Sequence, residues 1–553
     1  MSKPSTTHIT RAQMRTLAKL SPFELKDFLI TAAKENAAGN PALFLNAGRG
    51  NPNWIATTPR EAFFSLGQFA VEEAKRPMNL LDLGGMPQKD GIAARFDTWL
   101  ERNKTGPGVK LLREAVDYGV KKLGFNADAF IYELTDSTIG DQYPVPDRML
   151  GHAEQVVHAY LVKEMCGGKA PRGKFQLFAV EGGTAAMCYI FNTLKANRLL
   201  KKGDKIAIGV PIFTPYLEIA GLEDFDLEVV QIKANDVPNV DPEAGQYPAE
   251  EIAKLEDKRI KAFFVVNPSN PPSFAIQSQT LRQIAKLVKT KRPDLIVLTD
   301  DVYGTFVSGF RSLLAELPYN TIGVYSFSKY FGCTGWRLGV IATHEKNILD
   351  GQIAGLPAKE KAALRRRYGS LTLEPDKMKF IDRLVADSRC VALNHTAGLS
   401  LPQQVMMTLF SLFGLIDEQD TYKATCHEIV HRRLHALYRG LGFPIPTNAS
   451  YSAYYIMFDL MLWAKLRHGE DFCRFLAKNY DPFDLIFRIA EKHGVVLMDG
   501  GGFGGPKWSF RISLANLADE TYEKIGDFLV DCAQDYLGAW EKSKPTKQQT
   551  NGK

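Results

Sequence analysis

One lysine among hydroxyl-bearing residues is the part of this sequence best suited to covalent chemistry. Lys329 lies in residues 326–339, which read SFSKYFGCTGWRLG and follow a short apolar run at 321–325. The neighbouring hydroxyl groups can hydrogen-bond a phosphate, and Arg337 can hold one through two parallel bonds. A partly desolvated lysine beside another cation loses proton affinity and becomes an amine nucleophile able to form a Schiff base. The alternative is a loop lysine with an incidental arginine, since a short motif alone is only a hypothesis.

A glycine turn after an apolar strand offers a site for an anion. Residues 175–180 read as a strand, and Gly183 and Thr184 open a helix from Ala185 to Asn197. The free N–H groups of the first helical turn and the helix dipole attract negative charge to this point. The glycine pair is weak evidence alone, and its place between a strand and a helix strengthens it.

Three later strands end in residues that could hold an aromatic cofactor. Strand 205–210 precedes Phe213, strand 262–266 precedes Asn270 in the turn NPSNPP, and strand 295–299 precedes Asp300 and Tyr303. A carboxylate at such a strand end can keep a pyridine nitrogen protonated, so that the ring withdraws electrons. The alternatives are a core aromatic residue at Phe213 and a helix-capping aspartate at Asp300.

Strand and helix segments alternate, which predicts an α/β fold. Strand–helix units joined by right-handed crossovers place the carboxyl ends of their strands along one edge of an open, mostly parallel sheet. That edge brings together Gly183, Phe213, Asn270, Asp300 and Lys329. We therefore expect a large domain whose sheet lies between helices.

An arginine on a late strand is suited to bind a carboxylate. Arg511 lies in the sequence SFRIS at 509–513. Its planar guanidinium can hold the α-carboxylate of an amino acid through two bonds. A glycine-rich tract at 500–505 precedes this strand. A nucleotide-binding loop is the alternative for that tract, but no strand, GK[ST] motif and helix surround it.

Composition and charge narrow the class of protein. The chain has 553 residues, 45% hydrophobic and 24% charged, which suggests a globular protein of several domains. The formal net charge of +6 is small and the basic residues are dispersed, so we expect no nucleic-acid partner. Seven cysteines without metal-ligand spacing predict reduced thiols, no metal site and a cytoplasmic location. No segment reaches the ~20 apolar residues of a membrane span, so we expect a soluble protein without a membrane partner.

The order and spacing of these motifs resemble those of the fold-type I pyridoxal-phosphate enzymes of the aspartate aminotransferase superfamily. The shared features are N-P-x-N-P at 267–271, D-x-x-Y at 300–303, the lysine segment at 326–339 and R-I-S at 511–513. The resemblance implies the fold-type I transferase fold, with a smaller α/β domain built from N-terminal and C-terminal parts. It also implies pyridoxal 5′-phosphate bound covalently to Lys329, which would also move the proton at Cα.

The same resemblance assigns a role to each residue around the cofactor. It implies a phosphate site at Gly183, Thr184, Ser326 and Arg337, Phe213 flat on the pyridine ring, Asn270 and Tyr303 at the phenolic oxygen, and Asp300 at the ring nitrogen. Pro272 and Ser273 stand where Thr-Gly is usual in the family. This departure leaves the role of Asn270 intact and changes the loop that follows.

Two N-terminal segments complete the implied site. Tyr143, in GDQYPVPD at 140–147, would reach the cofactor phosphate of a partner subunit. The alternative is a packing tyrosine in a proline-stiffened loop. The predicted strand Ala42–Gly48 leads into a turn that would lie over the substrate, so Gly48 joins Arg511 and Asn270 among the expected substrate-binding residues.

The chain divides into five segments by pattern. We expect a mobile N-terminal arm at 1–20, the N-terminal part of the small domain at 21–60, a large cofactor-binding domain at 61–425, the C-terminal small domain at 426–541 and a disordered tail at 542–553. The large domain includes extra helical segments, one of them at 365–389.

The N-terminal extension and the motif sequences together resemble one branch of the superfamily, the bacterial aspartate 4-decarboxylases. That branch implies conversion of L-aspartate to L-alanine and CO2 through a ketimine and an enamine, with aspartate aminotransferase side activity. It also implies a homo-oligomer built from dimers, with a dodecamer as one such assembly. The main alternative is an ordinary aminotransferase for aspartate or another amino acid that uses 2-oxoglutarate. A regulator with a pyridoxal-binding sensor domain is a further alternative, but the N-terminus shows no basic helix-turn-helix.

Overall fold

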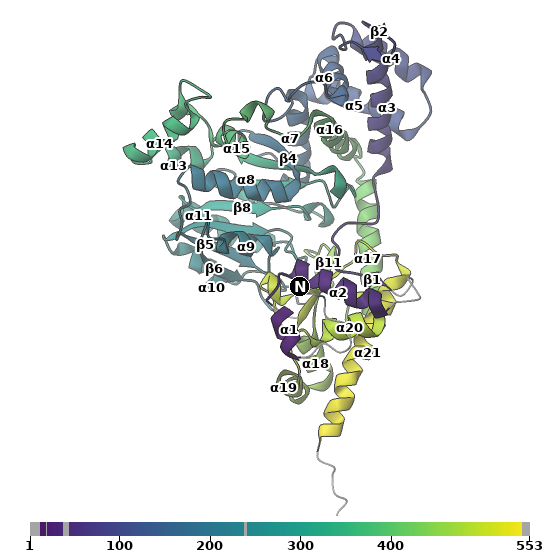
Figure 1. The fold of residues 1–553 in the computed structure, drawn as a ribbon, viewed down its shortest axis with the longest axis vertical. Coiled ribbons are helices and arrows are strands. Elements are labelled where there is room, and N and C mark those ends of the chain that lie inside the picture. Colours follow the sequence, from purple (N-terminus) through teal and green to yellow (C-terminus); the bar gives the residue numbers. More distant parts are fainter. Residues whose placement is uncertain (1–10, 18, 37–43, 237–240, 545–553) are drawn as a thin grey trace, which may run out of the picture.

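The fold was described from a computed structural model, which covers residues 11–17, 19–36, 44–236 and 241–544. Its larger part is built on a seven-stranded sheet in the order β4-β10-β9-β8-β7-β5-β6 (Figure 1). The strands are β4 Phe175–Glu181, β5 Lys205–Val210, β6 Glu228–Lys233, β7 Ile260–Val266, β8 Ile296–Asp300, β9 Thr321–Ser326 and β10 Leu338–His344. Only β10 runs antiparallel to its neighbours.

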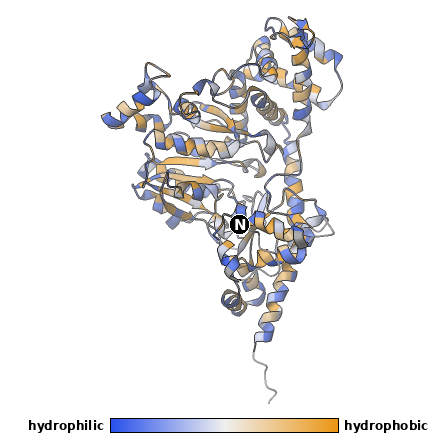
Figure 2. Ribbon diagram, in the orientation of Figure 1, coloured by the Kyte–Doolittle hydropathy of each residue, from blue (hydrophilic) through white to orange (hydrophobic). Residues whose placement is uncertain are grey.

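Near-continuous apolar runs form these strands because helices cover both faces of the sheet. Along β7, Phe264 and Val266 pack on the face that carries α8 (Gly182–Ala196), while Phe263 and Val265 pack on the opposite face. This alternation is the period of two that a strand requires. Figure 2 shows the strands of the sheet as mostly hydrophobic.

The helices of the larger part begin with one before β4, alternate with the strands from β4 to β9, and end with four successive helices after β10. They are α7 Gly151–Cys166, α8 Gly182–Ala196, α9 Pro215–Gly221, α10 Ala249–Ala253, α11 Ser278–Lys291, α12 Leu313–Glu316, α13 Ile348–Ala354, α14 Ala358–Tyr368, α15 Phe380–Ser388 and α16 Leu401–Ile416. The expected helical segment at 365–389 is the end of α14 together with α15, and α15 packs on α8.

A helical region before the sheet packs on α16 through α3. It contains α3 Thr57–Lys75, the short hairpin β2 Asn79–Leu80 and β3 Leu83–Gly84, α4 Ile92–Arg102, α5 Pro107–Leu123 and α6 Ala127–Ile139. Figure 1 shows this region at the end of the molecule farthest from the C-terminal helix.

The smaller part combines both ends of the chain, as expected. It holds α1 Arg11–Leu17, α2 Pro22–Asn36, β1 Leu45–Asn46, α17 Thr421–Leu441, β11 Tyr455–Asp459, α18 Leu460–His468, α19 Glu470–Asn479, α20 Asp484–His493, β12 Val495–Val496, β13 Met498–Asp499, β14 Ser509–Ser513 and α21 Glu520–Ser543. β1 pairs with β12, and β14 lies between β11 and β13, so N-terminal and C-terminal strands meet beside the large sheet.

Some N-terminal and C-terminal expectations differ from the structure or lie beyond it. The strand expected at Ala42–Gly48 is a strand only at Leu45–Asn46, and residues 42 and 43 lie outside the described residues. Of the expected arm at 1–20, residues 11–17 form a helix, and residues 1–10 lie outside the description, as do 545–553 of the expected tail. No helix in the described ranges has the length and apolar character needed to cross a membrane.

Candidate active site

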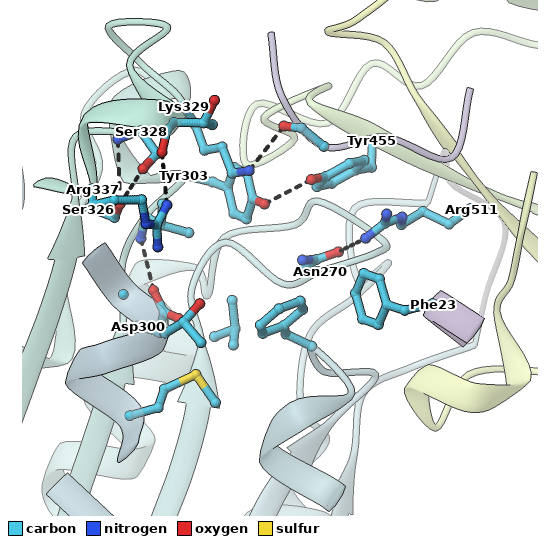
Figure 3. Close-up of a pocket in the computed structure, with 18 residues that line it drawn as sticks. Phe23, Asn270, Asp300, Tyr303, Ser326, Ser328, Lys329, Arg337, Tyr455 and Arg511 are labelled. Atoms are coloured by element: carbon cyan, nitrogen blue, oxygen red, sulfur yellow. Dashed lines mark hydrogen bonds between the residues drawn. The ribbon is translucent and has the colours of Figure 1, made fainter. Parts of the chain in front are cut away.

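A cavity of about 220 Å³ lies where the carboxyl ends of β7, β8 and β9 meet the start of α8 (Figure 3). The smaller part closes its other side through Arg511 on β14 and Tyr455 on β11. Ten of the residues expected at the site line this one cavity: Gly183, Thr184, Phe213, Asn270, Asp300, Tyr303, Ser326, Lys329, Arg337 and Arg511. The crossovers of the sheet thus bring together side chains spread over more than half of the sequence.

Lys329 lies in the turn after β9 and reaches back over the cavity. Its Nζ donates a hydrogen bond to the carbonyl of Gly50 at 3.0 Å (Figure 3). Burial is the main cause that lowers the pKa of Lys329, and the positive charges of Arg511 and Arg337 act in the same direction. A lowered pKa increases the share of neutral amine, which is the form that attacks a carbonyl carbon.

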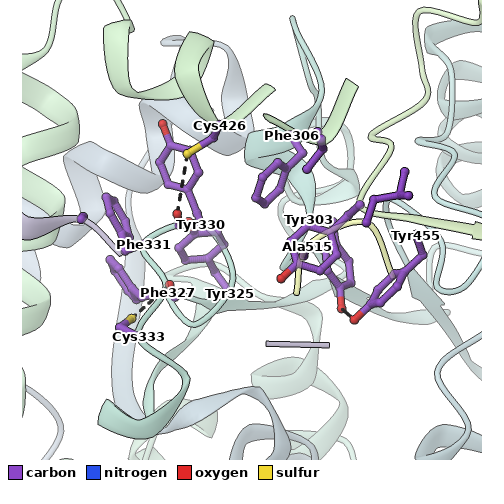
Figure 4. Packing of buried hydrophobic residues seen from close by; sticks show 14 of the residues in the cluster. Tyr303, Phe306, Tyr325, Phe327, Tyr330, Phe331, Cys333, Cys426, Tyr455 and Ala515 are labelled. Carbon is purple, nitrogen blue, oxygen red and sulfur yellow. Dashed lines mark hydrogen bonds between the residues drawn. The ribbon is translucent and has the colours of Figure 1, made fainter. Parts of the chain in front are cut away.

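An aromatic cluster anchors the turn that carries Lys329. Phe327 and Phe331 are fully buried (Figure 4). Phe327 stacks on Tyr160 with ring centroids 5.7 Å apart. Since these rings occupy the core, the intervening Ser328 and Lys329 line the cavity. The large apolar residues of this segment therefore orient its reactive ones.

Asp300 ends β8, and its carboxylate faces the cavity. Its Oδ2 accepts a hydrogen bond from the Tyr216 hydroxyl at 3.2 Å, and its Oδ1 accepts one from the Val302 N–H at 3.3 Å. Burial raises the pKa of Asp300 to about 6, against the effects of these bonds and of Lys329. The neighbouring Asp301 instead accepts hydrogen bonds from Thr299 and Ser312 on the far side and does not line the cavity.

The start of α8 and the turn before β10 form a cradle for an anion. Gly182 has φ +83°, a conformation that favours glycine, and a Cβ there would lie 2.6 Å from Nη2 of Arg337 and displace the guanidinium. The Arg337 guanidinium donates to the carbonyls of Thr334 and Glu181 at 2.8 and 3.3 Å. Free N–H groups of the first turn of α8, an arginine and serine hydroxyls together suit a phosphate.

Arg511 is a buried cation with neutral partners. Only 2% of its surface is exposed. Nη1 donates to Oδ1 of Asn270 at 3.2 Å and Nη2 to the Gly48 carbonyl at 2.9 Å, while Nε is buried without a hydrogen-bond partner in the described chain. The guanidinium also lies over the Tyr455 ring at 4.4 Å. Because an uncompensated buried charge is costly, this site suits a carboxylate ligand.

The structure does not bring two of the expected residues to the cavity of the single chain. Tyr143 is 64% exposed and meets His395 edge-on, with ring centroids 5.8 Å apart. Its reach to a partner's cofactor therefore stays a prediction. Gly48 acts through its carbonyl on Arg511, and Gly50 lines the cavity in its place. The expected turn therefore lies over the cavity, but the residue that lines it is two positions later than expected.

Sequence reasoning missed several residues that line the cavity. Among them are Phe23 on α2, Gly50, Ser328, Thr334 and Tyr455. Ser328 and Thr334 lie inside the lysine segment, where their hydroxyl groups were a signal. Phe23 meets Phe213 edge-on at 5.8 Å from a distant helix, and no local pattern marks such a contact.

Comparison with known proteins agrees with this geometry. The family model described as aminotransferase class I and II matches residues 178–529. A Pseudomonas protein named bifunctional aspartate aminotransferase and L-aspartate beta-decarboxylase is 50% identical over 93% of this chain and 95% of its own length.

Solved structures share the fold at low sequence identity. An aromatic aminotransferase from Pyrococcus horikoshii superposes with a TM-score of 0.54 at 18% identity, over 91% of this chain and 99% of that one. An N-succinyldiaminopimelate aminotransferase from Mycobacterium tuberculosis gives 0.55 at 16% identity, over 95% and 100%. The sheet order, the matched family and the long alignment agree, and the chain therefore belongs to the class I and II aminotransferase family.

Proposed function

We propose that this protein is a pyridoxal-phosphate-dependent aspartate 4-decarboxylase with aspartate aminotransferase side activity. One observation carries the proposal. The same cavity is lined by the amine of Lys329, the buried carboxylate of Asp300 and the guanidinium of Arg511, which is suited to bind a carboxylate. The chain that holds them is half identical, over nearly its whole length, to a protein named for both activities.

The residues of the cavity fit pyridoxal 5′-phosphate group by group. Its aldehyde suits Lys329 and its ring nitrogen suits Asp300, while Gly183, Thr184, Ser326 and Arg337 suit its phosphate. When bound, this cofactor supplies an aldehyde for a Schiff base and a ring that withdraws electrons. Asn270 gives its carbonyl oxygen to Arg511, so its NH2 group is left to donate to the phenolic oxygen beside Tyr303.

The remaining tasks follow from the same placement. Arg511 binds the α-carboxylate of L-aspartate, and Lys329 moves the proton at Cα because its neutral amine is both base and, once protonated, acid. Phe213 lines the cavity where the cofactor ring would lie, and Phe23 on α2 packs edge-on against Phe213. The net reaction breaks the bond between Cβ and the side-chain carboxylate and consumes one proton to give L-alanine and CO2.

The pKa of Asp300 predicts how cofactor affinity depends on pH. Its folded value of about 6 lies above the ordinary 3.8, so the proton stabilises the fold below pH 3.8 and that contribution is lost as the pH rises through about 6. Only the carboxylate attracts a protonated ring nitrogen. We therefore expect the affinity of the wild type for pyridoxal phosphate to rise between pH 5 and 7, and this rise to be about tenfold larger than the rise in Asp300→Asn. Absorbance titration measures both affinities. Parallel pH dependences in both proteins would contradict this pairing.

An ordinary aspartate aminotransferase is the second candidate, favoured by the family match. The two candidates differ in their need for an acceptor. We expect the purified protein with L-aspartate and pyridoxal phosphate, but no 2-oxoglutarate, to form alanine and CO2 in equal amounts over many turnovers. Proton NMR of alanine and a CO2 sensor measure the two products. Product formation that depends strictly on 2-oxoglutarate would leave the aminotransferase as the function.

The assembly and the location are part of the same proposal. Exposed apolar side chains on the β2–β3 hairpin, among them Leu81 at 99% exposure, and the exposed Tyr143 support a homo-oligomer built from dimers, with a dodecamer as one possible size. Sedimentation velocity of the holoenzyme tests this, and a monomer would oppose it. Free thiols at all seven cysteines support the cytoplasm as its location.

A further inference from the structure

The conversion of aspartate to alanine requires protons at two different carbon atoms, Cα and Cβ. The following inference rests on the proposed function and concerns the second proton. Loss of CO2 leaves the electron pair of the broken bond in the Cα–Cβ unit, and a proton must then be added at Cβ to complete the methyl group of alanine. An acid must therefore stand in the cavity besides the group that serves Cα.

Most protic groups of the cavity already have a task. Lys329 serves Cα, Asp300 the ring nitrogen and Tyr303 the phenolic oxygen, while the serine and threonine hydroxyls lie at the phosphate end. Arginine side chains do not release protons in proteins, which excludes Arg511. Among the described residues that line the cavity, the hydroxyl of Tyr455 is the acid without a task.

The position of the Tyr455 hydroxyl suits this task. It lies 3.0 Å from the Tyr303 hydroxyl (Figures 3 and 4), and Figure 3 shows it between the side chains of Lys329 and Arg511. A Cβ added to Gly50 would lie 2.5 Å from this oxygen and 3.3 Å from Nζ of Lys329, so both groups flank the same glycine. A substrate whose α-carboxylate binds Arg511 and whose Cα lies at Lys329 is therefore bound next to the Tyr455 hydroxyl.

The surroundings of Tyr455 stabilise the charge that proton transfer leaves behind. The guanidinium of Arg511 lies 4.4 Å from the ring centroid, and a positive charge there favours a developing phenolate. Burial raises the pKa of Tyr303 well above its ordinary value, so its hydroxyl stays uncharged beside the Tyr455 oxygen. The donor and its support thus form one hydrogen-bonded pair.

A residue that departs from the family pattern holds Tyr455 in place. Ser273 stands where glycine is usual, and it adopts φ +66°, a conformation unfavourable for a residue with a side chain. Its hydroxyl accepts a hydrogen bond from the Tyr455 N–H at 3.0 Å, while the Tyr451 hydroxyl donates to the Tyr455 carbonyl at 3.0 Å. The strained serine therefore acts as a positioning residue for the tyrosine.

We propose that Tyr455 is the acid that protonates Cβ. The O–H bond of Tyr455 breaks, its proton forms the new C–H bond of the methyl group, and the electron pair left from the lost CO2 forms that bond. The phenolate oxygen keeps the electron pair of its own O–H bond and takes up a proton from solvent before the next turnover. No oxidant or reductant takes part.

Hydrogen exchange in L-alanine tests the proposal, because removal of a methyl proton is the reverse of this step. Holoenzyme and L-alanine in D2O are followed by proton NMR, which reports exchange at Cα and at Cβ in one sample. In Tyr455→Phe we expect the ratio of Cβ to Cα exchange to fall about 100-fold, the lower range for loss of a general acid. The absorbance of the bound cofactor in the same sample shows that the site is loaded.

Tyr319→Phe is the control, since Tyr319 is 42% exposed and does not line the cavity. Its exchange ratio should equal that of the wild type. If Tyr455→Phe does not fold, Ser273→Gly should lower the ratio in the same direction by a smaller factor. An unchanged ratio, or equal loss at both carbons, would overturn the role of Tyr455. A wild type that makes no alanine from aspartate would instead overturn the proposed function.

Discussion

Replacing Lys329 by alanine is expected to remove both reactions of aspartate at once. The amine is the one lysine that lines the cavity among the described residues, and it alone can hold an aldehyde covalently there. Loss of a general base typically costs 10²–10⁴-fold, so we expect alanine and oxaloacetate formation to fall by roughly 10⁴-fold when the nucleophile is lost as well. The absorbance band of the Schiff base should disappear with them.

Lys289→Ala provides the control for this variant, because Lys289 is exposed on α11 and remote from the cavity residues. It should keep the band and both rates. A Lys329→Ala protein that decarboxylates aspartate at the wild-type rate would refute the assignment of the lysine. One that loses decarboxylation and keeps transamination would contradict the assignment of both reactions to Lys329.

Replacing Arg511 by lysine is expected to have the next largest effect. Lysine keeps the charge and loses the two parallel bonds to a carboxylate, so the α-carboxylate is held poorly. The Nε of Arg511 is also buried without a hydrogen-bond partner in the described residues, so it can donate to a bound carboxylate. A hydrogen bond to a charged group contributes about 1.5–3 kcal/mol, so the loss of two such bonds should lower kcat/KM for L-aspartate by roughly 10³-fold.

The same variant should lower kcat/KM for L-alanine as a transamination substrate by a similar factor, because both amino acids share the α-carboxylate. Steady-state kinetics with the two substrates measures this. Arg282→Lys, an exposed position on α11, is the control and should leave both values unchanged. A loss confined to aspartate would place Arg511 at the β-carboxylate instead.

The pair Asp300 and Asp301 shows how far local sequence pattern reaches. The spacing of Asp300 to Tyr303 predicted which of the two faces the cofactor, and in the structure Asp300 lines the cavity while Asp301 bonds Thr299 and Ser312. Successive residues of a strand point to opposite sides, so the choice was encoded within four residues. The same holds for Lys329, whose turn follows β9 directly.

Gly48 shows that a local pattern can predict the correct turn and still miss the residue that lines the cavity. The turn after β1 does lie at the cavity, but Gly50 lines it and Gly48 supports Arg511. The register of that turn depends on the pairing of β1 with β12, which lies some 450 residues later in the chain. The residue preferences of turns cannot predict a pairing between strands so far apart in the sequence.

What the sequence by itself determined is the chemistry along one edge of the sheet: a nucleophilic lysine, a carboxylate, an anion cradle and an arginine on a late strand. Those residues are recoverable because each lies within a few positions of a strand end, and strand ends follow from apolar runs. Only the tertiary structure decided that Phe23, Gly50 and Tyr455 join them, and that Tyr143 stays outside the cavity of the single chain. Their places depend on contacts between segments far apart in the chain, which hydrophobic periodicity does not encode.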